Sequence, residues 1–317
     1  MIAVLGLLAF ALLLNTIGTR WVVGAAWARR CPAAALTVWH GLAVGTAVSA
    51  AAALLLLAHD ISEHALIWAL AADEAAFHSL YAYDLALPLW WNVAAVPVAA
   101  ALVWAAAVLM RHLLEIRRTR MSHDRLLQMG QARNLAPDVQ VLSHSTPAIY
   151  CLARSRSGPV VVTSAALDAL SPASLNAAIS HERAHLALRH HRSVGLSKVV
   201  GSTLGPIGLL RDYPPQVRLL CELAADAAAS REVGPRVVAA AILDIATARF
   251  DQTALPAATL SADGSDVEVR VRELLHASQG RAGARSRWLA RVAATVAIGF
   301  PLVAAVGPAL TLAGTAG

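Results

Sequence analysis

The sequence predicts a mainly α-helical membrane protein with four transmembrane helices and one α+β domain inserted between the third and the fourth. Two observations carry this prediction. Hydrophobic residues make up 57% of the chain and charged residues only 15%, and the mean hydropathy is +0.57, a balance typical of proteins that sit in a bilayer. The apolar residues also gather in four long uncharged runs, and the segments between these runs differ in the sign of their charge.

Each of the four runs is long enough to cross the hydrocarbon core as a helix, which takes roughly 20 residues. They cover residues 1–19, 32–58, 85–110 and 292–315. A cleavable signal peptide is the alternative for the first run, with a cleavage site at 26–28. However, no positive charge precedes that run, and two arginines follow directly after the cleavage site, so we favour a retained span.

The charges beside the runs predict the orientation of the chain. Arginine dominates between the first two runs and directly after the third, whereas the 59–84 loop holds five acids and neither lysine nor arginine. Because positively charged loops stay on the cytoplasmic side, both termini are predicted outside the cytoplasm and the 112–287 domain inside it. Apolar residues recur at helical spacing in the outer loop, which favours an amphipathic helix on the membrane surface.

The 112–287 domain contains a predicted β-hairpin followed by a predicted helix. Two short apolar runs, Ala148–Ala153 and Pro159–Thr163, flank a polar turn that contains glycine, as hairpins do. Ser171 and Pro172 then mark a helix start, because serine caps the first amide groups and proline fits the first turn. An extended peptide can add to the edge of such a sheet and so lie beside the helix.

That helix carries His181, Glu182 and His185 in the sequence HERAH. Histidines four residues apart project from the same face of a helix, so both imidazoles can bind one cation. The glutamate beside the first histidine is placed to act as a general base on a water molecule activated by the metal. This is the HExxH pattern of zinc peptidases, and it predicts one catalytic Zn²⁺ ion.

A catalytic zinc site needs a third protein ligand, and two nearby histidines are the first candidates. His191 lies ten residues after His181, but Leu188 stands where sites of that spacing use a helix-breaking glycine. An unbroken helix therefore aims His191 about 100° away from the pair, and His190 roughly opposite to it. Both histidines fit better in a basic surface near lipid headgroups or an acidic partner.

Glu222 is the favoured third ligand. Glu222 and Asp226 are four residues apart in the run RLLCELAADAAAS, so they share one face of a strongly helical segment. The remainder of that segment is apolar, which isolates the two acids in a buried setting. Glu222 can then bind the metal from a second helix, while Asp226 accepts the remaining N–H of a ligating histidine and orients its ring.

Charge and cysteine content exclude other classes of function. The net charge of +6 comes almost entirely from arginine. Arginines that flank membrane spans explain this excess, so we predict no direct binding to nucleic acid. The three cysteines form neither a disulfide framework nor a CxxC zinc site. Arg270 and Arg272 are compatible with substrate binding and equally with a solvated surface, so the sequence assigns them no role.

HERAH followed by ELAAD, with three spans before the pair and one after it, resembles the BlaR/MecR-type membrane zinc metallopeptidases. The resemblance covers essentially the whole chain. It implies a minimal gluzincin-type peptidase fold, with Glu182 as base, Asp226 behind the ligands and one zinc ion on His181, His185 and Glu222. The best-known members carry a penicillin-binding domain after the last span, whereas this sequence ends at Gly317. A short form without direct β-lactam sensing is therefore expected.

Sensor-transducer members of that family cleave a cytoplasmic winged-helix repressor of the BlaI/MecI kind and thereby switch on antibiotic-resistance or stress genes. The resemblance implies the same role in signal transduction for this membrane metalloendopeptidase, and a homodimer is compatible with it. The alternative is a quality-control or processing protease of the HtpX or CAAX type, which shares HExxH and ExxxD. An intramembrane protease is disfavoured, because Arg183, Arg189 and Arg192 surround the motif and charges are costly at that depth.

Overall fold

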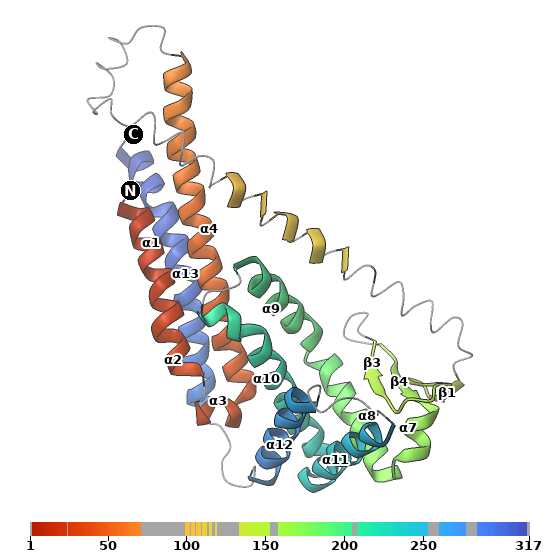
Figure 1. Cartoon of the computed structure of the whole chain (residues 1–317). Coiled ribbons are helices and arrows are strands. Elements are labelled where there is room, and N and C mark those ends of the chain that lie inside the picture. The colour runs from red at the N-terminus through yellow and green to blue at the C-terminus, as the bar shows by residue number, and fades with distance from the viewer. Residues whose placement is uncertain are drawn as a thin grey trace.

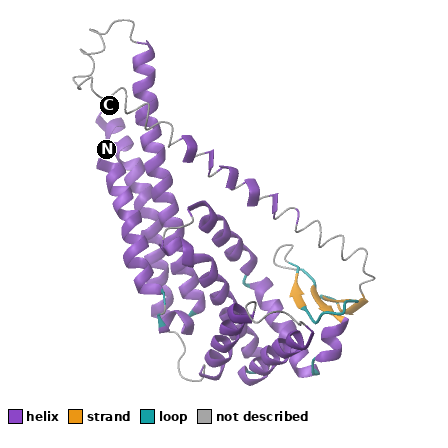
Figure 2. Cartoon of the chain, viewed as in Figure 1, coloured by secondary structure: helices purple, strands orange, loops and turns teal. Residues whose placement is uncertain are grey.

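A computed structural model of the chain describes residues 2–23, 25–70, 133–152, 158–204, 208–252, 260–276 and 284–315, together with parts of 99–118. The described chain is mostly helical with one small sheet (Figures 1 and 2). The predicted outer loop from residue 71 onwards, most of the third predicted span and the predicted hairpin turn lie outside the described residues.

Three long helical segments form a bundle. The first comprises α1 (Ile2–Leu13), a π-helical stretch (Leu14–Gly18) and α2 (Thr19–Val22), and it is followed by the short α3 (Ala26–Arg30). The others are α4 (Pro32–Leu70) and α13 (Ala284–Thr315). The start of α1 and the end of α13 lie at the same end of this bundle (Figure 1).

Among the described residues, two helical stretches, Ile2–Val22 and Pro32–Leu57, are long and apolar enough to cross a membrane. Their positions agree with the first two predicted spans and are compatible with association with a membrane. Apolar helices at Ala99–His112 and Trp288–Ala304 are shorter, so the total of four spans stays a prediction. The helix α4 continues past the predicted end of the second span at residue 58 and reaches Leu70.

The helices α4 and α13 approach each other closely at two glycines. A Cβ atom added to Gly41 would lie 2.5 Å from Ala294 Cα, and one added to Gly45 would lie 2.4 Å from the Ala297 carbonyl oxygen. Small residues four apart allow this contact between backbones, which is a common way to pack helices inside a membrane. The close approach holds the fourth predicted span against the second.

Gly45→Ala is expected to destabilise the bundle by about 1 to 3 kcal/mol, because the new methyl group forces α4 and α13 apart. Gly299→Ala on α13 is the matched control, since nothing lies within 4 Å of the Cβ position there. Thermal unfolding of both variants in the same detergent measures the difference. Equal melting temperatures for the two would contradict the close packing of α4 on α13.

A four-stranded sheet lies away from the bundle (Figure 1). Its strands are β1 (Arg133–Ala136), β2 (Val139–Leu142), β3 (Ile149–Cys151) and β4 (Val160–Thr163), in the order β1-β2-β4-β3. The antiparallel pairing of β3 with β4, with Tyr150 opposite Val161, confirms the predicted hairpin. Since β3 is at the edge of the sheet, one side of its backbone pairs with no other strand among the described residues.

Six helices follow the sheet in the chain and connect it to the bundle. They are α7 (Ser164–Ala169), α8 (Pro172–Ala187), α9 (His190–Leu204), α10 (Gly208–Val233), α11 (Pro235–Gln252) and α12 (Leu260–His276). The helix α8 packs on β3, α10 and α11. The strands and α8 share one apolar core, whereas the first half of α10 packs with α4 in another. The predicted domain limits at residues 112 and 287 stay predictions.

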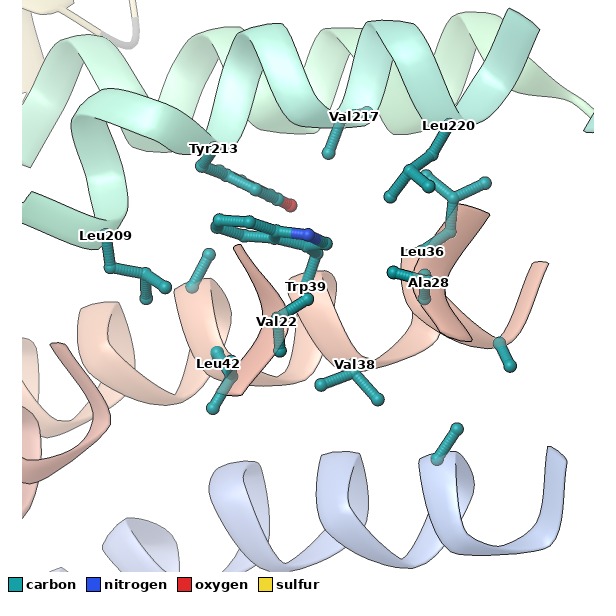
Figure 3. Close-up of a cluster of buried hydrophobic side chains, with 14 of the residues drawn as sticks. Val22, Ala28, Leu36, Val38, Trp39, Leu42, Leu209, Tyr213, Val217 and Leu220 are labelled. Carbon is teal, nitrogen blue, oxygen red and sulfur yellow. The ribbon is translucent and has the colours of Figure 1, made fainter. Parts of the chain in front are cut away.

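The helix α10 links the bundle to the candidate site. Tyr213 on α10 is fully buried and stacks on Trp39 of α4, with ring centroids 6.2 Å apart (Figure 3). Its hydroxyl oxygen lies 2.6 Å from His40 Nδ1, so the histidine inside the second predicted span is hydrogen-bonded. A second link joins Arg29 Nε to Glu273 Oε1 of α12 over 3.2 Å. Both α10 and α12 also carry residues of the site.

Candidate active site

The helix α8 presents the HERAH motif to the sheet and to α10. Its start follows the prediction: Pro172 occupies the first turn, and the Ser171 hydroxyl accepts a hydrogen bond from the Ser174 amide. The two motif histidines lie side by side, and their Nε2 atoms are 3.0 Å apart. Arg183, between them, forms two hydrogen bonds of 2.7 and 2.8 Å to Asp138 beside β2, which ties this turn of α8 to the sheet.

The structure brings Glu222 to this histidine pair. Glu222 Oε2 lies 3.3 Å from His181 Nε2, and Glu222 Oε1 lies 3.4 Å from His185 Nε2. Ligand atoms of the three residues all fall within 4.8 Å of one another, and this is the one such candidate metal triad among the described residues. Thirty-seven residues of chain separate Glu222 from His185, so tertiary packing creates the group.

The donor set and its spacing fit a zinc ion. Two imidazole nitrogens and one carboxylate form a usual catalytic set, which leaves a fourth position open. Tetrahedral ligands at about 2.0 to 2.1 Å from zinc are roughly 3.3 to 3.4 Å from each other. The Nε2 atoms of the two histidines are 3.0 Å apart, and they lie 3.3 and 3.4 Å from the two different oxygens of Glu222, which is close to that value.

Asp226 and Arg270 support the triad from behind. Asp226 is almost fully buried, and its Oδ1 lies 2.8 Å from His181 Nδ1. Arg270 donates to both oxygens of Asp226 over 2.7 and 2.8 Å, and its Nη1 lies 3.1 Å from Glu222 Oε2. The charge of Arg270 thus compensates the buried carboxylate of Asp226 and the half-buried carboxylate of Glu222, which keeps the pKa of Asp226 low although burial alone raises it.

Sequence reasoning assigned no role to Arg270. It stands 44 residues after Asp226, in α12, and no spacing rule connects two such helices. Its only sequence signal is the need for a cation beside two acids that lie in an apolar segment, because unpaired buried charges are costly. That signal does not identify which arginine of the chain supplies the cation. Arg272, by contrast, is exposed and pairs with Glu268 on the same helix.

The side chain of Glu182, which belongs to the HERAH motif, faces the edge strand β3. Its Oε2 accepts a hydrogen bond of 3.0 Å from the Cys151 amide. On either side of β3, the Leu152 amide donates to the Pro159 carbonyl and the Ala148 carbonyl accepts from the Thr163 amide. The amide of Cys151 therefore points to the other side of the strand, away from β4, as alternation in antiparallel pairs requires. Burial raises the pKa of the Cys151 thiol to about 12, and nearby Glu182 adds to the shift, so this cysteine stays protonated.

The prediction that His190 faces away from the motif was wrong. It assumed an unbroken helix, but α8 ends at Ala187 and the backbone turns at Leu188 and Arg189, where Arg189 has φ 55°. The chain then starts α9 at His190. As a result the His190 side chain is buried, and its Nδ1 lies 2.9 Å from His185 Nδ1.

A cavity of about 210 Å³ opens at the site. Its apolar lining comes from β3, α8, α11 and α12. Its polar lining consists of His181, Glu182, Glu222, Asp226 and Arg270. The apolar residues include Ile149, Ala177, Val238, Ile242 and Val267. A peptide segment with an apolar side chain can therefore reach the motif.

Zinc affinity is expected to rise about tenfold for each pH unit up to about pH 9, because zinc must displace a proton. Burial opposes protonation of His181, but Asp226 and Glu222 outweigh it and raise the pKa of His181 to about 9. The metal-free protein therefore holds this proton below pH 9 and loses it above. Competition with a chromophoric chelator at several pH values measures the slope; a flat profile would contradict the assignment.

A triad of two histidines and one glutamate, with Glu182 beside it, is a set of side chains that metal-dependent hydrolases use. The comparison with known families agrees: residues 115–205 match Peptidase family M48, and this match indicates a zinc metallopeptidase. The matched segment covers under a third of the chain and ends before Glu222. Searches against curated proteins and against solved structures gave no match.

Proposed function

We propose that the protein is an integral-membrane zinc metalloendopeptidase that holds one zinc ion on His181, His185 and Glu222. The observation that supports it is a cluster of two imidazoles and one carboxylate on two helices, the one such cluster among the described residues, with Glu182 beside it in the lining of the cavity. The match to Peptidase family M48 supports the same class of enzyme.

Each residue of the site has a defined task in peptide hydrolysis. Zinc, when bound, supplies a Lewis acid that polarises a carbonyl and lowers the pKa of water. Glu182 removes a proton from the attacking water and delivers it to the leaving amine as the C–N bond breaks. Asp226 orients the ring of His181, and Arg270 offsets the charge of Asp226 and Glu222.

The substrate is proposed to add as a strand along the open edge of β3. The Cys151 amide points to that side and donates a hydrogen bond to Glu182. A peptide carbonyl that accepts from the Cys151 amide takes over this hydrogen bond, and Glu182 is then released toward the water. Substrate binding and positioning of the base are therefore coupled in this proposal.

We further propose four membrane spans, with both termini outside the cytoplasm and the catalytic domain inside it. Support comes from the arginine-rich segments near the first and third spans and from the two described apolar helices. The start of α1 and the end of α13 at one end of the bundle are compatible with termini on one side of the bilayer (Figure 1).

The proposed substrate is a cytoplasmic winged-helix repressor, so that cleavage transmits a signal to antibiotic-resistance or stress genes. This step is supported by the resemblance in HERAH and ELAAD and by the predicted arrangement of spans. The family match is equally compatible with a membrane quality-control or processing protease of the HtpX or CAAX type, which instead degrades misfolded membrane proteins or cuts tails.

Co-expression separates the two candidates. The full chain is produced with winged-helix repressors or, separately, with a misfolded membrane protein, and fragments are followed by immunoblot. The repressor proposal expects a discrete repressor fragment that disappears with Glu182→Ala and with a chelator. An intact repressor alongside a degraded membrane protein supports quality control, and no cleavage of either contradicts the peptidase proposal.

A further inference from the structure

We propose that His190 is a positioning residue for the metal site, because it accepts a hydrogen bond from His185 Nδ1 and so holds that imidazole toward the metal. This inference rests on the proposed metal site but not on the identity of the substrate. Its central observation is the 2.9 Å separation between the two Nδ1 atoms, with the rings nearly perpendicular at 82°.

The backbone places His190 by a specific break between two helices. On a continuous helix, a residue five positions after His185 would be rotated about 140° from it around the helix axis. Here the Leu188 amide bonds back to the Ala184 carbonyl, and Arg189 adopts a left-handed conformation. That conformation is uncommon for residues other than glycine. The break brings His190 back to the side of α8 that carries His185.

The tautomers of the two rings are determined by the metal. When His185 Nε2 faces the metal, its only proton is on Nδ1, which must donate. His190 Nδ1 is then the acceptor, so His190 has to be neutral with its proton on Nε2. Its surroundings meet this requirement, because the residue is only 3% exposed and burial disfavours the charged form of an imidazole.

The two candidate ligands therefore have partners of different charge. His181 has the carboxylate of Asp226 behind it, itself paired with Arg270. His185 has a neutral imidazole. A neutral acceptor fixes the ring without adding a further negative charge to a site that already contains the carboxylates of Glu222 and Asp226. The orientation of His185 thus depends on hydrogen-bond geometry rather than on ion pairing.

A matched pair of substitutions tests the inference. Asparagine and leucine have nearly the same branched shape, but only asparagine places an acceptor oxygen where His190 has Nδ1. His190→Leu is expected to weaken zinc binding about 10- to 100-fold, and His190→Asn to bind within a few-fold of the wild type. The full chain in detergent is titrated with zinc against a chromophoric chelator. His191→Asn controls for loss of a histidine at the start of α9 and should not change the affinity.

Melting of the metal-free variants separates positioning from folding, since the Asn and Leu variants should unfold at similar temperatures without zinc. If His190→Leu does not fold, His190→Met serves as the apolar variant. Equal zinc affinity in the Asn and apolar variants, whether both weak or both normal, overturns the inference while leaving the proposed peptidase intact. A wild-type chain that binds no zinc overturns both.

Discussion

Glu182→Ala is expected to lower the rate of peptide cleavage about 10²- to 10⁴-fold while zinc stays bound. The carboxylate is the only described acid of the cavity that is neither in the triad nor paired with Arg270, so no other group in the described site can take the proton from water. Cleavage is measured with a purified substrate, and zinc content by mass spectrometry on the same sample.

Two controls sharpen this result. Glu182→Gln keeps the size of the side chain and should be as inactive as alanine, because an amide does not accept the proton. Glu268→Ala removes an exposed acid of α12 that pairs with Arg272 and should leave cleavage unchanged. Substantial activity in both Glu182 variants would show that another group acts as base.

Glu222→Ala is expected to abolish stable zinc binding, with a loss larger than the roughly 10- to 100-fold typical when only a partner behind a ligand is removed. Without Glu222 only two donors remain, and Arg270 is left 3.1 Å from the vacated carboxylate position, where it repels a cation. Activity should therefore disappear together with the metal.

The matched control is Glu232→Ala, an exposed glutamate near the end of the same helix α10. It should keep normal zinc content and cleavage. Glu222→Gln extends the comparison, because it keeps the shape but removes the charge, and it should bind zinc weakly. A Glu222→Ala variant that retains one zinc per chain with wild-type affinity would remove Glu222 from the site.

Local patterns predicted the parts of the fold that depend on neighbouring residues. Ser171 and Pro172 begin α8 as the capping pattern requires, and the apolar runs on either side of the polar turn pair as β3 and β4. The apolar segment with Glu222 forms a helix. Each of these features arises from contacts within about fifteen residues of chain, where propensity and period are informative.

Features that depend on distant contacts or on one unusual backbone angle were not predictable. Arg270 reaches Asp226 from another helix, and its neighbour Arg272 has the same sequence environment but a solvated position. The Cys151 amide bonds to Glu182 only because β3 lies at the edge of the sheet. His190 was expected to face away from the motif. The backbone at Arg189 is left-handed, but the residue there is not glycine, so the sequence gives no sign of this turn.

The sequence by itself determined that His181 and His185 share one helix face and that Glu222 and Asp226 share another, because a helix repeats every 3.6 residues. It also determined where the chain is apolar enough to enter a membrane. Only the tertiary structure decided that these two faces meet around one position, that Arg270 compensates their charge and that His190 supports His185. Such contacts depend on how helices pack and where a backbone turns. The repeat of 3.6 residues within one helix predicts neither.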